Sequence, residues 1–144
     1  MKQLIRTILD DKGSHVESIG PEATVADGVR RMNEHRIGSL LVMEGVRPVG
    51  IFTERDVLVR VVAERLDPDA TPIRQVMTSP LVAIGPDQTV EDAMVIITKR
   101  RCRHLPVMDG NDLLGMVSIG DITRSLISHQ KAEIQDLVSY ITWG

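Results

Sequence analysis

Apolar residues recur at helical spacing in two stretches that each follow a Gly-Pro turn. A threonine precedes each stretch at the position of a helix N-cap, and an aspartate follows three residues later, as in a capping box. These residues are Thr24 and Asp27 in the first stretch, and Thr89 and Asp92 in the second. The apolar positions are Val25, Val29 and Met32, then Val90, Met94 and Ile97. The pattern predicts an amphipathic helix in each stretch.

Shorter apolar runs on both sides of these helices predict strands. One run precedes each helix, at 16–19 and 81–84, and two follow it, at 39–43 and 49–52, then at 104–108 and 114–117. Turns are expected around Gly45 and Gly110, and a second helix is expected to start near Glu54 and near Ile119. The predicted order is therefore β-α-β-β-α, occurring twice.

The two halves of the chain are copies of one unit. A shift of 65 residues aligns the sequence with itself without a gap, so that Ile84-Gly85-Pro86 falls on Ile19-Gly20-Pro21 and Asp121 falls on Asp56. We therefore divide the chain into a lead-in helix at 1–13, a first repeat at 14–66, a linker at 67–78, a second repeat at 79–129 and a helical tail at 130–144.

Neither repeat is large enough to bury a sufficient core alone. The predicted fold class is α/β (α+β), with two repeats packed sheet to sheet around a pseudo-two-fold axis and helices at both ends. The end helices carry apolar stripes, which we expect to pack on each other or on a second chain. The stripes are Leu4, Ile5, Ile8 and Leu9, and then Ile134, Leu137, Val138 and Ile141.

Composition narrows the function classes. The 144 residues carry a net charge of -3, which disfavours general binding to nucleic acid or to an anionic membrane. The only aromatic residues are Phe52, Tyr140 and Trp143, too few for a platform that stacks bases. With one cysteine, no run of bilayer length and no signal peptide, a cytoplasmic protein is expected.

Several motifs resemble the CBS domain family, whose tandem pair is called a Bateman module. Residues 50–56 and 115–121 both look like its Gly-apolar-apolar-Thr/Ser-x-x-Asp signature, and residues 77–80 and 103–107 are also similar to family motifs. The resemblance covers about residues 12–129 and implies a stand-alone regulatory protein. It implies binding of AMP, ADP, ATP, S-adenosylmethionine or NAD in clefts between the repeats, assembly as a homodimer, and signalling to a partner protein.

The pairs Thr53–Asp56 and Ser118–Asp121 have two interpretations. Each pair fits a capping box, which needs no ligand. The resemblance implies in addition that each carboxylate accepts the two hydroxyls of a ribose, with the hydroxyl side chain facing phosphate.

The resemblance also implies which residues hold the base and the phosphates. Thr78, Pro80 and Val82 would line the cleft of Asp56, and the more polar Gly13, His15 and Glu17 would line the cleft of Asp121. The base edge would be read by backbone groups left unpaired at the start of a strand. Cys102, Arg103 and His104 mark one strand entrance and the uncharged Ile37, Gly38 and Ser39 mark the other, so we expect the two copies to handle phosphate unequally.

Other functions stay open. Cys102 lies among arginines that favour a thiolate, so a nucleophile or redox sensor is one alternative, although it aligns with the apolar Ile37. A nucleic-acid contact at 99–104 is disfavoured by the acidic total, and a structural subunit with empty clefts is compatible with the sequence. His15 alone could be an exposed loop residue. Neither a catalytic constellation nor metal-ligand spacing is readable, so we expect no enzyme and no metal.

Overall fold

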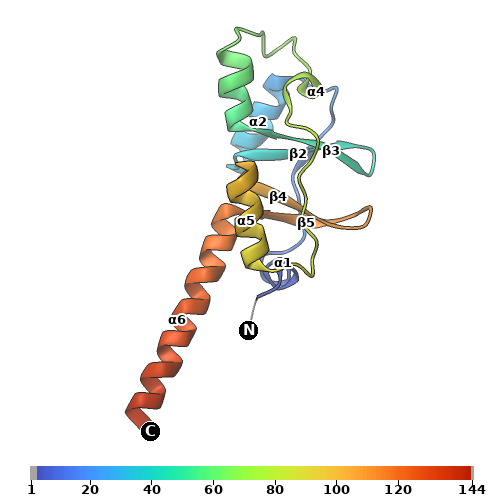
Figure 1. The fold of residues 1–144 in the computed structure, drawn as a ribbon. Helices are drawn as coiled ribbons and strands as arrows, with labels where there is room; N and C mark the ends of the chain where they lie inside the picture. Colours follow the sequence, from blue (N-terminus) through green and yellow to red (C-terminus); the bar gives the residue numbers. More distant parts are fainter. Residues whose placement is uncertain (1–2, 144) are drawn as a thin grey trace. The chain divides into compact units, whose positions relative to one another are not determined.

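The computed structural model describes residues 3–143, with the side chains of 140, 142 and 143 left aside (Figure 1). The ends of the predicted lead-in and tail, residues 1, 2 and 144, lie outside the described residues. The chain forms two compact units. The first unit comprises residues 15–82, and the second comprises residues 3–14 together with 83–143.

The first unit is a three-stranded sheet with helices. Strand β1 (Ser18–Ile19) runs parallel to β2 (Ser39–Glu44), which pairs antiparallel with β3 (Arg47–Thr53). Helix α2 (Val25–His35) joins β1 to β2. After β3, α3 (Glu54–Asp56) continues into a π-helical segment, η1 (Val57–Val62), and α4 (Ile73–Val76) follows. The predicted β-α-β-β-α order is confirmed here.

The second unit repeats this plan with a reduced sheet. Strands β4 (His104–Asp109) and β5 (Asp112–Ser118) pair antiparallel, and Ile84 makes a single parallel bridge to Val107 where the first unit has β1. The unit contains α1 (Ile5–Lys12), α5 (Val90–Arg100) and α6 (Ile119–Trp143). A register shift falls between Val42 and Met43 in one unit and between Val107 and Met108 in the other. The internal repeat therefore extends to a strand irregularity.

Local sequence explains where the helices begin. The predicted capping boxes of Thr24 with Asp27 and of Thr89 with Asp92 both form, so each threonine satisfies a backbone amide that a helix start leaves without a partner. The predicted turns also form, with glycine in the left-handed region at Gly45 and Gly110. The mixed α/β fold with two copies of one unit is confirmed.

The lead-in helix and the linker each belong to a different unit than the sequence division indicates. Helix α4 lies inside the predicted linker, but its Ile73 and Val76 are buried in the core of the first unit. Helix α1 belongs to the second unit, where Ile5, Ile8 and Leu9 are buried. The 65-residue shift places Ile8 on Ile73, so each unit uses the segment that precedes the other repeat. The apolar stripe of α1 therefore needs no second chain to cover it.

The C-terminal prediction needs a second correction. The tail at 130–144 is not a separate helix, because α6 runs without a break from Ile119 to Trp143. Its start packs into the unit, with Ile122 fully buried, whereas the described residues from Ile127 onward are exposed, and the helix continues beyond the other elements of its unit (Figure 1). The apolar stripe here remains uncovered, at Ile127, Ile134, Leu137, Val138 and Ile141.

Candidate functional site

Asp56 lies at the start of the helix that follows β3, and its carboxyl group is almost fully buried. The exposed fraction of the residue is 5%. Asp56 Oδ2 accepts the Thr53 amide at 2.9 Å and the Thr53 hydroxyl at 3.2 Å, while the Asp56 amide donates back to Thr53 Oγ1 at 3.3 Å. The predicted capping box is present. It occupies Oδ2 and leaves Oδ1 directed elsewhere.

Thr78 supplies the partner of the other oxygen. Its hydroxyl donates to Asp56 Oδ1 at 3.0 Å, so a residue that lies 22 positions away in sequence completes the group. The backbone of Thr78 is fully used by Ile51, with its amide donating at 2.8 Å and its carbonyl accepting at 3.0 Å. The expectation that this backbone stays unpaired for reading a base is therefore wrong at Thr78, because an isolated antiparallel bridge pairs it with β3.

Gly50 explains why Thr78 can come so close. A Cβ at Gly50 would lie 2.6 Å from Met77 Sδ and 3.0 Å from the Thr78 carbonyl oxygen. The repeated glycine, Gly115, has the same use in the second unit, where a Cβ would lie 2.8 Å from Leu9 Cδ2. The glycine of the Gly-apolar-apolar-Thr/Ser motif thus leaves room for the Thr78 backbone at Gly50 and for the Leu9 side chain at Gly115.

The first strand entrance lies beside Asp56, as expected. Gly38 accepts the amide of Glu54 at 3.0 Å through its carbonyl, and Ser39 pairs with Thr53 in the sheet. Ile37 is half-buried next to them. Pro80 is exposed and Val82 is half-buried within the same unit. Their contact with a ligand stays a prediction.

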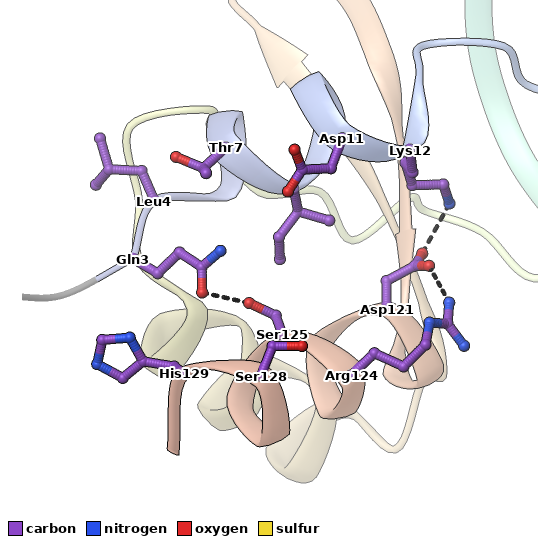
Figure 2. Close-up of a pocket in the computed structure, with 11 residues that line it drawn as sticks. Gln3, Leu4, Thr7, Asp11, Lys12, Asp121, Arg124, Ser125, Ser128 and His129 are labelled. Carbon is purple, nitrogen blue, oxygen red and sulfur yellow. Dashed lines mark hydrogen bonds and ion pairs between the residues drawn. The ribbon is translucent and has the colours of Figure 1, made fainter. Parts of the chain in front are cut away.

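Asp121 has the matching place in the second unit but different partners. The carboxyl group is again buried, with 8% of the side chain exposed. Asp121 Oδ2 accepts the Ser118 amide at 2.8 Å, and the Asp121 amide donates to Ser118 Oγ at 3.1 Å, so this capping box is also present. Two cations complete the group, Lys12 Nζ at 2.7 Å from Oδ2 and Arg124 at 2.5 Å from Oδ1 (Figure 2).

Burial of the Asp121 carboxyl group opposes its ionisation, but hydrogen bonds from Lys12 and from Ser118 outweigh this effect. The pKa of Asp121 therefore lies below its usual value. The group is an anion at neutral pH and remains available as a hydrogen-bond acceptor.

The cations at these carboxylates were not found from the sequence. Arg124 follows Asp121 by three positions and Arg60 follows Asp56 by four, with Arg60 Nε 3.8 Å from Asp56 Oδ1. Such spacings place side chains on one helix face and could have been noticed. Lys12 lies 109 positions from Asp121, and no local sequence signal connects the two residues.

The second strand entrance lies beside Asp121. The carbonyl of Arg103 accepts the Ile119 amide at 2.8 Å, and His104 pairs with Ser118 in the sheet. The side chain of Arg103 is exposed and that of His104 is half-buried. Burial raises the pKa of the Cys102 thiol, and a backbone hydrogen bond and the charge of Arg100 only partly oppose this. The thiol is therefore not activated, which argues against the nucleophile alternative.

The three residues expected beside Asp121 are divided between the units. Gly13 follows Lys12 in the second unit and has a φ of 95°. His15 and Glu17 belong to the first unit, where His15 Nε2 lies 2.6 Å from Glu17 Oε1 and His35 Nε2 lies 3.5 Å from Glu17 Oε2. The hydrogen bond with His15 lowers the pKa of Glu17. The side chain of His15 is 82% exposed, and its contact with a ligand stays a prediction.

An open cavity of about 890 Å³ lies between α1 and the start of α6 in the second unit (Figure 2). Lys12, Asp121 and Arg124 line one end of it. At the other end the Ser125 hydroxyl donates to the Gln3 side chain, next to His129. The volume lies in the range of small-molecule sites.

Comparison with known proteins identifies the family. Residues 9–63 and 73–128 match the CBS domain. Over 126 residues the chain is 36% identical to "CBS domain-containing protein CBSX3, mitochondrial" of Arabidopsis thaliana, covering 84% of this chain and 61% of that protein. It is 30% identical over 126 residues to CBS domain-containing protein YhcV of Bacillus subtilis, covering 88% of this chain and 89% of that protein. The chain thus spans less than two thirds of CBSX3 but most of YhcV.

Solved structures show the same architecture. A protein with CBS domains from Burkholderia ambifaria, ascribed to signal transduction, superposes with a TM-score of 0.85 at 36% identity over 89% of this chain and 96% of that one. A CBS-CP12 protein from bloom-forming cyanobacteria, described as hexameric, gives 0.75 at 33% identity over 85% of this chain and 71% of that one. Among residues 3–143, no helix combines the length and the apolar character that crossing a membrane requires. The chain belongs to the CBS-domain family and carries two CBS domains.

Proposed function

We propose that this chain is a regulatory sensor, which binds adenine nucleotides such as AMP, ADP, ATP or NAD and signals their presence to a partner protein without catalysing a reaction. The observation that carries the proposal is the group around Asp56. A buried carboxylate there is completed by the hydroxyls of Thr53 and Thr78 at 3.2 Å and 3.0 Å. Both hydroxyls can rotate, so both can give way to a ligand that donates hydrogen bonds.

A ribose suits this group chemically. Its two adjacent hydroxyls can donate to the two oxygens of one carboxylate, and hydrogen bonds to a charged acceptor are the strong ones. The displaced Thr53 and Thr78 hydroxyls could then donate to phosphate or ribose oxygens. Gly38 stands at the adjacent strand entrance, where its carbonyl accepts the Glu54 amide and Glu54 Oε1 lies 2.7 Å from the position that a Cβ would take, so phosphate has to displace the Glu54 carboxylate to approach the backbone here.

The second unit offers the same turn with more positive charge around it. Arg103 and His104 stand where the first unit has Gly38 and Ser39. This difference supports unequal handling of phosphate by the two copies, with the more highly phosphorylated ligands favouring the second unit.

The exposed stripe of α6 supports self-assembly. Ile127, Ile134 and Ile141 repeat every seven residues, and Leu137 lies three residues after Ile134, the spacing of a coiled-coil seam. All four side chains are between 46% and 77% exposed. We propose that two copies pair along this stripe, and the relative described as hexameric shows that self-association occurs in the family.

A thermal-shift screen of AMP, ADP, ATP, NAD, NADH and S-adenosylmethionine tests the sensor function. A ligand at a hundredfold excess over its dissociation constant stabilises the folded state by about 2.7 kcal/mol. For a chain of this size, that corresponds to a rise in Tm of roughly 5–12 °C. Catalysis is followed by chromatography of the same mixtures. A flat response to all six compounds contradicts the sensor function, and turnover of any of them contradicts the non-catalytic part of the proposal.

A further inference from the structure

The two buried carboxylates, Asp56 and Asp121, differ in the hydrogen-bond partners that they already have. Within 3.5 Å, the hydrogen-bond donors to the Asp56 carboxylate are neutral: the Thr53 amide and the hydroxyls of Thr53 and Thr78. Arg60 approaches no closer than 3.8 Å. An incoming ribose therefore replaces one hydroxyl donor with another at this group.

The Asp121 carboxylate has fewer acceptor positions left for a ligand. A carboxylate has about four acceptor positions, two on each oxygen. Oδ2 already accepts the Ser118 amide at 2.8 Å and Lys12 Nζ at 2.7 Å, and Oδ1 accepts Arg124 at 2.5 Å. One position remains on Oδ1 and none on Oδ2, so a ribose that donates to both oxygens has to displace a partner of Oδ2.

Lys12 is the partner that can leave. The Ser118 amide belongs to the backbone at the start of α6 and is fixed there by the capping box. Lys12 is the last residue of α1, and its side chain is 36% exposed. Backbone bonds hold the other end of the helix, from Ile5 to Gln88 and from Arg6 to Pro86, each at 2.9 Å. The Lys12 side chain can therefore swing away while α1 stays in place.

Lack of space does not close this site. The cavity beside Lys12, Asp121 and Arg124 measures about 890 Å³, which is ample for a nucleoside. What closes the site to a ribose is that both acceptor positions of Asp121 Oδ2 are already occupied. Lys12 Nζ also donates to the Met116 carbonyl at 2.8 Å, so its docked position is supported at two points.

We propose that Lys12 is a built-in competitor for the ribose subsite at Asp121. A ligand with one phosphate or none then binds first at Asp56, and at Asp121 only when Lys12 withdraws. This inference rests on the proposed function and adds its regulation: the second site responds at a higher ligand concentration than the first, and its threshold is set by the docking of Lys12 from α1.

Calorimetric titration with adenosine and with AMP tests the inference. Adenosine carries the ribose without phosphate, so it separates competition at the carboxylate from attraction of Lys12 for phosphate. The variants are Lys12→Met, the double variant Lys12→Met with Asp121→Asn, and Lys99→Met as a matched control at an exposed position on α5. Unliganded stability is measured for each variant, because Lys12→Met removes two hydrogen bonds.

In the parent, one equivalent of adenosine binds before a weaker second one. Lys12→Met strengthens the second event by about tenfold, since a half-exposed charged hydrogen bond no longer opposes it. The added Asp121→Asn change abolishes this gain, and Lys99→Met leaves both events as in the parent.

Two outcomes overturn the inference while leaving the sensor function intact. One is a second event that is unchanged in Lys12→Met. The other is a loss of AMP affinity without a gain for adenosine, which would make Lys12 a phosphate ligand. If neither compound binds the parent or Lys12→Met, the inference fails, whereas the sensor function is contradicted only by a flat response to all six compounds of the thermal-shift screen.

Discussion

Replacing Gly28 with alanine tests how the first unit fits its one large aromatic side chain against α2. A Cβ at Gly28 would lie 2.7 Å from Phe52 Cε2 and 2.9 Å from Ile73 Cδ1. Phe52 and Ile73 are both fully buried, so neither has free space to move into. Overpacking of this kind costs about 1–3 kcal/mol. Against this, alanine stabilises a helix interior by about 1 kcal/mol relative to glycine. We expect Gly28→Ala to destabilise the chain by about 1 kcal/mol in net terms.

The second unit has a different pair of residues at this contact between helix and strand. The 65-residue shift places Ala93 on Gly28 and Val117 on Phe52, so a larger helix residue there faces a smaller strand residue. In a Phe52→Val background, Gly28→Ala should therefore become stabilising by up to about 1 kcal/mol, because the helix preference remains and the phenyl ring is gone. The sign reversal corresponds to a coupling of about 2 kcal/mol between the two positions.

Urea unfolding followed by far-ultraviolet circular dichroism measures all four members of this cycle, with equal m values as the check on two-state behaviour. Ala93→Gly serves as the reciprocal control and should cost about 1 kcal/mol or more. If Gly28→Ala stabilises the parent as much as it stabilises Phe52→Val, then close packing does not require the glycine, and the reasoning is refuted.

Two further predictions concern Asp121 and α6. Because the pKa of Asp121 is lowered by folding, its contribution to stability is present above its unfolded pKa and is lost as pH falls through the lower folded value. Asp121→Asn should therefore lower stability at pH 7 and flatten the acid loss below about pH 4 in Tm measurements, and an unchanged acid slope would count against the Lys12–Asp121–Arg124 group. Light scattering should give twice the 15.9 kDa chain mass for the parent and the monomer mass for Leu137→Asp, and a parent that stays monomeric would refute pairing along α6.

Much of the fold was predictable because it depends on local chemistry. Capping threonines, glycine turns and short apolar runs act within a few residues, so the helix starts and strand pairs follow from the sequence. The exchange of α1 and α4 between the units was not predictable in this way. Ile8 and Ile73 have the same apolar pattern, and only tertiary packing decides which sheet each one covers.

In the site, too, the local features were predictable and the contacts between distant segments were not. The Thr53–Asp56 and Ser118–Asp121 pairs are local, and both were predicted together with their capping boxes. The contrast between a neutral partner for Asp56, at Thr78, and a charged one for Asp121, at Lys12, comes from segments far away in sequence. The more polar cleft expected at Asp121 from Gly13, His15 and Glu17 stays a prediction, and Lys12, which the structure places on the Asp121 carboxylate, was not part of it.

Calorimetric titration of AMP into Asp56→Ala tests the central claim most directly, with Asp27→Ala as the matched control. Both changes remove the aspartate of a Thr-x-x-Asp capping box, but only Asp56 also meets Thr78. If Asp56 accepts ribose hydroxyls, its loss costs about 1.5–3 kcal/mol of binding, which is about a ten- to hundredfold weaker affinity, while Asp27→Ala binds AMP as the parent does. Equal AMP affinity in the parent and both variants would show that the Asp56 carboxylate is only a helix cap and would contradict the account.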